Sequence, residues 1–289
     1  MLLTVLLWGS AFAAIRAGLR SYSPTHLALL RFLCASAAMA VYALVTRMRM
    51  PECRDVPAVF VLGFLGFAFY NVALNIGERS IASGPAALLI QTSPIWTALL
   101  ASIFLSERLN VFGWIGIGIG FCGALTISLG GEFAFIPNWS AALILAAAIS
   151  SSIFNIVQKR MLSRYRPTEL TAYAVWAGTL LLLPFVGGFP AAFASAPAVD
   201  TLAAVFLGVG PAAAGYALWA VVISGLPASR AVSFLYAIPI VAFLVGWLWL
   251  GETPGIQDIV GGLLALGGVA TVNTLGRTAR PMDRISAGE

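Results

Sequence analysis

The sequence predicts an all-α integral membrane protein with ten transmembrane helices arranged as two inverted five-helix repeats. First, 60% of the 289 residues are hydrophobic and only 9% are charged, unlike any ordinary soluble domain. Second, the apolar runs match the roughly 20 residues that a membrane helix needs, and they lack the polar–apolar alternation of barrel strands. Third, the second half of the chain repeats residues of the first half at a constant spacing.

Charged residues form short islands that separate the apolar runs and mark the helix ends. The first run, "MLLTVLLWGSAFAAIR", lacks the basic start of a signal peptide and is interpreted as the first membrane helix. The polar segment 276–289 is predicted to be a disordered cytoplasmic tail. The predicted spans are 1–16, 24–46, 56–77, 81–105, 110–130, 138–159, 167–188, 200–223, 227–250 and 254–275.

Two proline–glutamate pairs align with each other in an internal sequence repeat. A shift of 145 residues aligns Pro94 with Pro239 and Glu107 with Glu252. Further pairs at this shift are Gly63 with Gly208, Gly116 with Gly261, Gly123 with Gly268 and Thr126 with Thr271.

Upstream, a shift of 143 aligns "SPTHL" (23–27) with "RPTEL" (166–170). We therefore expect one five-helix repeat over 1–130 and a second over 138–275. Because five is odd, the second repeat enters the membrane from the opposite side, which is typical of alternating-access transporters.

Basic residues predict that both termini are cytoplasmic. With the N-terminus inside, twelve Lys and Arg residues lie in inside loops or the tail and three in outside loops. The basic balance of the chain thus follows from topology and does not indicate a nucleic-acid partner. The inside residues are Arg47, Arg49, Arg54, Arg108, Lys159, Arg160, Arg164, Arg166, Arg230, Arg277, Arg280 and Arg284; the outside ones are Arg16, Arg20 and Arg79.

Pro94 and Pro239 lie near the middle of their predicted spans, where a proline removes a backbone hydrogen bond and bends the helix. They are predicted to shape a cavity or to act as pivots, and a static kink is the alternative. Glu107 and Glu252 lie at span ends on opposite faces of the membrane. Each is interpreted as a helix cap, a loop contact or a gate latch, with an ordinary interfacial residue as the alternative.

Polar residues inside membrane helices are candidates for a binding site. Asn71 and Asn75 share one face of the third span with Glu78, and Asn155 lies on a polar face of the sixth. Gln91 lies within the fourth span. These side chains are predicted to line a wet cavity for a polar solute, and hydrogen bonding between helices is the alternative.

Aromatic side chains inside the spans are predicted to form walls for a flat or amphipathic ligand. Packing against lipid or other helices is the alternative for each. These candidate wall residues are Trp8, Tyr70, Tyr216, Trp219 and Tyr236.

Arg31 lies about two turns into the second span, and two interpretations are open: attraction of a carboxylate, or snorkelling toward the outer interface. Near the middle of the spans there is neither an Asp nor a Glu. Proton-coupled pumps commonly use a buried carboxylate, and Glu78, near an external end, comes closest to that position. The coupling ion and the coupling mode are therefore left open among uniport, exchange and proton antiport.

An enzyme is disfavoured, because the chain has one histidine, no HExxH motif and no Asp pair near the middle of the spans. No cofactor or metal site is predicted, since the three cysteines show no metal-ligand spacing.

Small residues line one side of two Gly-rich spans and are predicted to let helices pack closely. They are Gly113, Gly116, Gly120 and Gly123 in one span and Gly261, Ala265 and Gly268 in the other.

The chain resembles the EamA type of the drug/metabolite transporter superfamily. The resemblance covers essentially the whole chain and rests on "WGSAFAAIR" in the first span, "LLRF" (29–32) in the second and the proline–glutamate pattern before each Gly-rich span. It implies a ten-helix exporter of the bacterial inner membrane, and the chain is similar to the aromatic amino-acid exporters of that type. It marks Pro94, Glu107, Pro239 and Glu252 as fold positions.

We therefore expect a secondary transporter, embedded in the lipid bilayer, that exports small amphipathic metabolites, above all amino acids including aromatic ones. The alternatives are a multidrug or cation exporter, a transporter of sugar-nucleotides or phosphorylated metabolites, and a polytopic membrane enzyme. The second alternative calls for several basic residues at cavity depth, where the sequence offers mainly Arg31.

Overall fold

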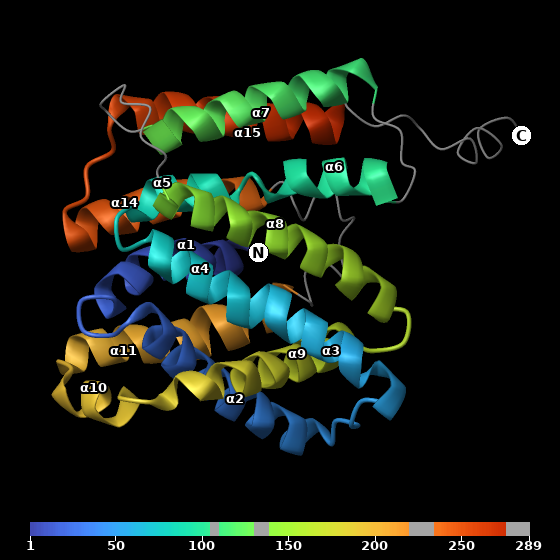
Figure 1. Cartoon of the computed structure of the whole chain (residues 1–289), viewed down its shortest axis with the longest axis vertical. Helices are drawn as coiled ribbons and strands as arrows, with labels where there is room; N and C mark the ends of the chain where they lie inside the picture. The colour runs from blue at the N-terminus through green and yellow to red at the C-terminus, as the bar shows by residue number, and fades with distance from the viewer. Residues whose placement is uncertain (105–109, 130–138, 220–233, 276–289) are drawn as a thin grey trace, which may run out of the picture.

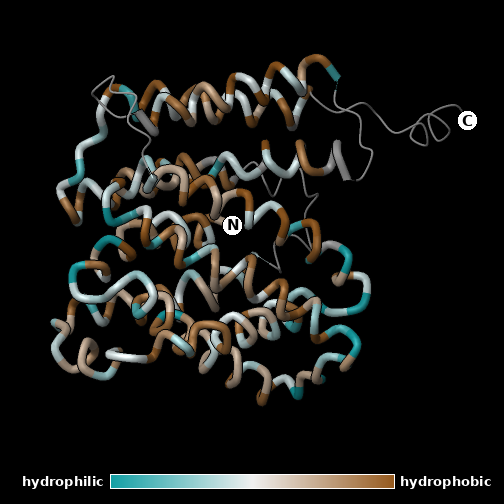
Figure 2. The backbone as a smooth tube through the Cα atoms, in the orientation of Figure 1, coloured by the Kyte–Doolittle hydropathy of each residue, from teal (hydrophilic) through white to brown (hydrophobic). Residues whose placement is uncertain are grey.

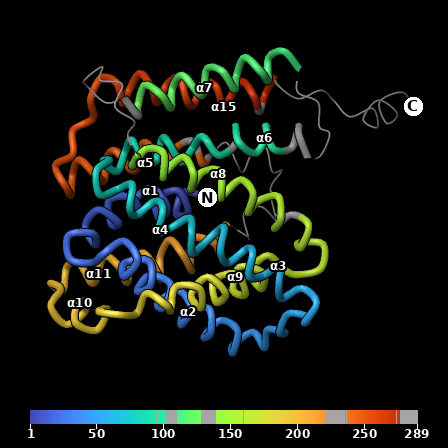
Figure 3. The backbone as a smooth tube through the Cα atoms, viewed as in Figure 1, coloured from blue at the N-terminus to red at the C-terminus, as the bar shows by residue number. Residues whose placement is uncertain are grey.

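The computed structural model describes residues 1–104, 110–129, 139–219 and 234–275, and the regular structure in them is helical throughout. The helices lie alongside one another in stacked layers (Figures 1 and 3). Figure 2 shows apolar residues along the helices and most of the strongly hydrophilic residues at their ends and connections. Within the described ranges, five stretches are long and apolar enough to cross a membrane: Pro24–Thr46, Cys53–Gly77, Trp139–Gln158, Pro167–Val186 and Ala198–Trp219.

The all-helical architecture expected from the hydropathy pattern is confirmed for the described residues. The first half consists of α1 (Leu2–Gly18), α2 (Pro24–Thr46), a short 3₁₀ turn η1 (Cys53–Asp55), α3 (Val56–Gly63), a π-helix η2 (Phe64–Ala68), α4 (Phe69–Gly77), α5 (Ser83–Ile90), α6 (Ser93–Phe104) and α7 (Val111–Leu129).

The second half contains a helix that the sequence did not predict, α10, in the connection between two predicted spans. Its described elements are α8 (Trp139–Met161), α9 (Pro167–Leu182), a 3₁₀ turn η3 (Leu183–Val186), α10 (Phe189–Ser195), α11 (Ala198–Leu207), a π-helix η4 (Gly208–Gly215), a 3₁₀ turn η5 (Phe234–Ala237), α14 (Ile238–Val245), a π-helix η6 (Gly246–Leu250) and α15 (Ile256–Thr274).

Pro94 and Pro239 lie at helix starts and not, as predicted, at bends inside continuous helices. The span predicted over 81–105 is broken at Gln91 and Thr92, and Pro94 is the second residue of α6. Pro239 is likewise the second residue of α14, directly after the 3₁₀ turn η5. The first turn of a helix suits proline, because backbone N–H groups there have no partner within the helix. Pro94 therefore begins a helix after a break, and Pro239 begins one where a 3₁₀ turn passes into an α-helix.

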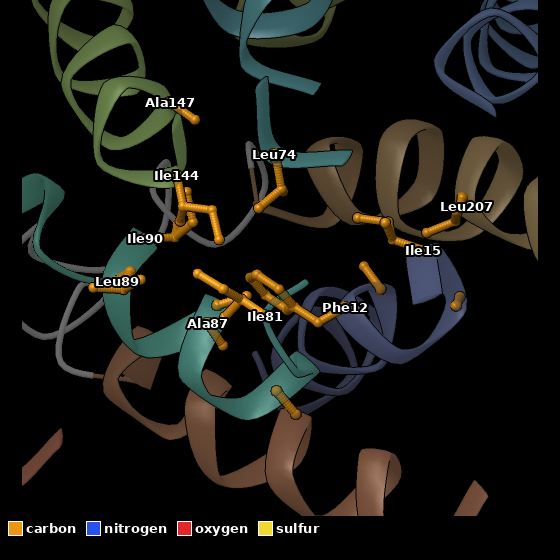
Figure 4. Close-up of a cluster of buried hydrophobic side chains, with 14 of the residues drawn as sticks. Phe12, Ile15, Leu74, Ile81, Ala87, Leu89, Ile90, Ile144, Ala147 and Leu207 are labelled. Atoms are coloured by element: carbon orange, nitrogen blue, oxygen red, sulfur yellow. The ribbon is translucent and has the colours of Figure 1, made fainter. Parts of the chain in front are cut away.

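Two main clusters of buried apolar side chains connect the layers. One surrounds α1, where Phe12 and Ile15 meet Leu74 of α4 and Leu207 of α11 (Figure 4). The other connects α2, α3 and α9 and includes Phe32. Lipid tails are as apolar as these side chains, so close packing and dispersion stabilise the contacts more than removal from water does.

The Gly-rich helices α7 and α15 pack side by side in one outer layer (Figure 1). A Cβ atom added at Gly123 would lie 2.3 Å from the backbone nitrogen of Ala265, and one added at Gly268 would lie 2.4 Å from that of Gly120. Only residues without a side chain permit this approach of the two backbones. The small residues predicted to allow close packing therefore lie at the contact between α7 and α15.

Candidate functional site

An aromatic cluster lies where α1 meets the segment after η4. The ring centre of Trp8 lies 5.3 Å from that of Tyr216 and 5.7 Å from that of Trp219. Phe67 of η2 adds a fourth ring, 5.5 Å from Tyr216. The structure thus brings together three of the predicted wall residues. Phe67, which was not predicted as a wall residue, joins them from the same predicted span as Tyr70.

The π-helix η4 positions the aromatic cluster. Trp8 Nε1 donates a hydrogen bond of 3.1 Å to the carbonyl oxygen of Pro211, which lies inside η4. A π-helix and an internal proline both disturb the usual backbone hydrogen bonds of a helix, so carbonyl groups are available to side chains. Gly215 leaves room for the indole, since a Cβ atom there would lie 2.7 Å from Trp8 Nε1.

Arg31 of α2 is buried beside this cluster, with 7% of its surface exposed, and does not snorkel to the interface. Its Nε has no hydrogen-bond partner, and the guanidinium interacts electrostatically with Tyr216, Tyr70 and Glu78. A buried guanidinium with an unused donor is costly unless an anion or water occupies the place next to it. The site therefore offers a carboxylate group a strong partner beside aromatic walls.

Asn71 and Asn75 add buried acceptors on α4. The Nδ2 of Asn71 donates to the carbonyl oxygen of Phe67 at 2.8 Å, and that of Asn75 donates to Pro24 at 2.9 Å. Both side-chain oxygens are buried without a partner. Tyr70 on the same helix is half-buried and lies close enough to Arg31 for an electrostatic interaction. The amide oxygens remain free to accept from an ammonium or hydroxyl group.

Gln91 connects the two helix breaks. Its Nε2 donates a hydrogen bond of 2.7 Å to the carbonyl oxygen of Leu235, in the 3₁₀ turn before α14. On the other side, Ser152 of α8 donates to the carbonyl oxygen of Ser93, at the start of α6, at 2.8 Å. The amide of Gln91 thus satisfies a carbonyl that has no α-helical partner four residues on, because Pro239 lacks a backbone N–H, and Ser152 links α8 to the start of α6.

Four predicted site residues lie elsewhere or fall wholly or partly outside the described part. Asn155 is exposed on α8, because Ser150 and Ser152 occupy the buried face of that helix, and it does not join the cluster around Arg31. Glu107 lies outside the described residues. The backbone of Tyr236 belongs to η5, and its side chain, like that of Pro94, is outside the described set.

An ion pair closes the end of the bundle where α1 stops. Arg16 Nε lies 3.0 Å from Glu252 Oε1, and the backbone N–H of Ser83 donates to Glu252 Oε2 at 2.9 Å. Gly251 adopts a left-handed conformation, with φ of 71°, that turns the chain after η6 and places Glu252. The pair joins residues 236 positions apart in the sequence, so one contact ties together α1, α5 and the segment before α15.

Glu78 borders a cavity of about 270 Å³ beside this ion pair. Its side chain has no exposed surface, and its carbonyl oxygen accepts a hydrogen bond of 2.6 Å from Arg16. Glu78 lies one residue beyond the candidate span Cys53–Gly77. Burial raises the pKa of its carboxyl well above the ordinary value, against the opposing effects of Arg16 and Arg31. The cavity is lined by Arg16, Leu19, Arg20, Glu78, Arg79, Leu250 and Glu252.

The described residues contain no group of three or more His, Cys, Asp or Glu side chains able to hold a metal ion. What the geometry presents is a polar and aromatic cluster buried among apolar helices, with an ion pair closing one end. Intramembrane polar groups of this kind mark the path of a solute, and the arrangement is that of a membrane transporter.

The chain belongs to the EamA-like transporter family, whose model matches residues 1–129 and 138–274. It is 41% identical over 268 residues to the uncharacterized transporter YdfC of Bacillus subtilis, covering 92% of this chain and 87% of the relative. A probable terminal-alkyne amino-acid exporter of Streptantibioticus cattleyicolor is 39% identical over 279 residues, covering 96% and 94%.

Two further matches are more distant. The uncharacterized inner membrane transporter YedA of Escherichia coli strain K12 is 29% identical over 262 residues, covering 86% of this chain and 81% of the relative. A solved crystal structure matches with a TM-score of 0.64 at 21% identity, covering 93% of both chains. At that identity the structural match shows the fold alone.

Proposed function

We propose that this protein exports small amphipathic amino acids, including those with aromatic or other unsaturated side chains, by alternating access. The observation that carries the proposal is the buried Arg31 guanidinium near Tyr216, whose ring packs in one cluster with those of Trp8 and Trp219. A free carboxylate suits the unused donor of Arg31, and a flat side chain suits the aromatic walls.

The named relatives support a substrate of this class. One relative at 39% identity is a probable terminal-alkyne amino-acid exporter, and a terminal alkyne is a compact, electron-rich apolar group. A cation exporter fits the site less well, because the positive charge of Arg31 repels an organic cation. A sugar-nucleotide would need several buried basic groups, and Arg31 is the one buried Arg among the described residues.

The proposed architecture is ten membrane helices in two inverted five-helix repeats, 1–130 and 138–275. Observed helix positions support it: α7 spans Val111–Leu129 and α15 spans Ile256–Thr274, a shift of 145 at both ends. The same shift relates the start of α6 to that of α14. One π-helix, η2, begins directly after Gly63, and another, η4, begins at Gly208, the residue that the same shift aligns with Gly63.

Further support for the repeat comes from the family model, which matches the two halves as separate segments. Orientation follows from the distribution of Lys and Arg, which favours cytoplasmic termini in the bacterial inner membrane. In that orientation, the Arg16–Glu252 ion pair lies at the external end, and the tail 276–289 is cytoplasmic.

Transport by the purified protein in liposomes tests this function. Proteoliposomes would be loaded in turn with labelled L-phenylalanine, L-propargylglycine, tetraphenylphosphonium or a uridine diphosphate sugar, and efflux would be compared with that from empty liposomes. The proposal expects faster efflux of one or both amino acids and none of the other two compounds. Efflux of the phosphonium alone would make the protein a cation exporter, and efflux of the sugar-nucleotide alone would favour the second alternative.

A further inference from the structure

The buried carboxyl of Glu78 has no role in the amino-acid site described above. Neither of its oxygens has a hydrogen-bond partner, and its side chain has no exposed surface. Taking a charged carboxylate out of water without replacing its hydrogen bonds strongly favours the protonated acid. Glu78 therefore has the surroundings of a group that binds a proton.

The charges around Glu78 come from both the closed end and the interior of the bundle. α8 packs against α4 through apolar contacts, such as that of Ile144 with Gly77, and brings no charge. Among the described residues, the charged and titratable groups around Glu78 are Arg16 of α1, Glu252 after η6, Arg31 of α2 and Tyr70 of α4, with Arg20 and Arg79 lining the same cavity.

Arg16 is the group that connects Glu78 to the ion pair. Its Nε donates a hydrogen bond to the carboxylate of Glu252, and its Nη1 donates one to the carbonyl oxygen of Glu78. Both glutamates therefore lie around one guanidinium, whose five N–H donors can be shared between them. A negative charge on Glu78 attracts Arg16 and repels Glu252, so it opposes the observed pair.

We propose that Glu78 is a proton-binding site that couples export to the proton gradient through the Arg16–Glu252 ion pair. The proposal rests on the transport function proposed above. With Glu78 protonated, Arg16 pairs with Glu252 as observed, and the external end is closed. When Glu78 releases its proton, its carboxylate competes for Arg16, the pair weakens and the external end opens.

This arrangement accounts for antiport with one proton per cycle. External water supplies a proton to the ionised Glu78 while the external end is open, and the neutral acid lets Arg16 return to Glu252. After the protein opens to the cytoplasm, the same proton leaves the carboxyl to internal water. The proton moves inward as the amino acid moves outward, and no other reactant is needed.

Cysteine labelling measures the opening without a substrate. Leu19 lines the cavity, and a Leu19→Cys variant, with Cys34, Cys53 and Cys122 replaced, would carry one thiol there. Labelling by a membrane-impermeant maleimide would be measured in proteoliposomes between about pH 5 and pH 9, a range that a raised carboxyl pKa can reach. Because the thiol itself titrates, each rate is divided by the rate of the same thiol in a Glu78→Gln background.

The proposal expects this ratio to rise about fivefold or more from acid to alkaline pH, the scale of a typical coupling between sites. Glu252→Gln, which removes the charge that holds Arg16, should instead give a high ratio at every pH. Glu52→Gln, at an exposed loop position, is the matched control and should leave the ratio unchanged. A ratio that is constant with pH, or a low ratio in the Glu252→Gln variant, would overturn the proposal.

The two proposals fail in different ways. A labelling ratio that is constant with pH would rule out Glu78 as the proton site but would not bear on amino-acid export. If no amino acid leaves the liposomes but labelling still depends on pH, the proposed substrate class is wrong. The external end would then still open under the control of a proton.

Discussion

Replacing Arg31 with methionine should abolish carboxylate recognition without destabilising the protein. Methionine keeps a long, flexible side chain in the same place, so packing in α2 is largely retained. The guanidinium it removes is buried with 7% of its surface exposed, and its Nε is unpartnered. Because the native charge has incomplete hydrogen bonding, its removal should leave the thermal unfolding temperature in detergent unchanged or higher.

The loss of binding can be estimated from the charge-assisted contact that Arg31 would make. A hydrogen bond to a charged group contributes about 1.5–3 kcal/mol, which corresponds to a loss of affinity of about 10- to 150-fold. Isothermal titration of the purified protein with L-phenylalanine would measure this loss. The matched ligand is phenethylamine, which has the same ring and ammonium group but no carboxylate, and its affinity should stay the same or rise in Arg31→Met, because the substitution also removes a positive charge that repels the ammonium group.

Comparing the two ligands separates loss of the carboxylate contact from general damage to the site. Equal losses for L-phenylalanine and phenethylamine would mean that the substitution damages the site in general and that Arg31 does not bind the carboxylate. An unfolding temperature several degrees lower would contradict the claim that the buried charge is incompletely satisfied. Arg54→Gln, at an exposed position, serves as the control for loss of one positive charge.

Two further substitutions test the packing and the helix breaks. Gly268→Leu should separate α15 from α7, since a Cβ atom there lies 2.4 Å from the backbone nitrogen of Gly120, and should cost about 1–3 kcal/mol. Gly118→Leu, where nothing lies within 4 Å, should leave the unfolding temperature unchanged, and equal effects would contradict the packing. Gln91→Leu leaves the half-buried carbonyl of Leu235 without its donor and should destabilise by about 1–3 kcal/mol, whereas no change in unfolding temperature would count against the hydrogen bond that links α5 to η5.

Helix positions could be predicted closely because lipid makes hydrophobicity and length the dominant signals. The predicted span 24–46 matches α2, which covers Pro24–Thr46. The breaks at Gln91 and before Ile238 could not be predicted from proline alone. Proline is compatible both with a bend inside a helix and with a helix start, and the choice depends on partners such as Leu235 that are distant in the sequence.

The candidate site was only partly predictable for a similar reason. Trp8, Tyr216 and Trp219 were identified as aromatic residues inside spans, and the structure places their rings together. Whether Arg31 faces the interior or snorkels depends on the rotation of its helix, which packing against neighbours decides. The contact of Arg16 with Glu252 joins the two ends of the chain, and no local pattern encodes it.

Counterflow measures the central claim most directly, because it requires a carrier that binds its solute from either side. Proteoliposomes loaded with unlabelled L-propargylglycine or L-phenylalanine would be diluted into the same labelled amino acid at low concentration. We expect transient accumulation of label by the wild-type protein and a strongly reduced signal with Arg31→Met. No accumulation of either amino acid above that in empty liposomes would contradict the claim that this protein is an amino-acid exporter.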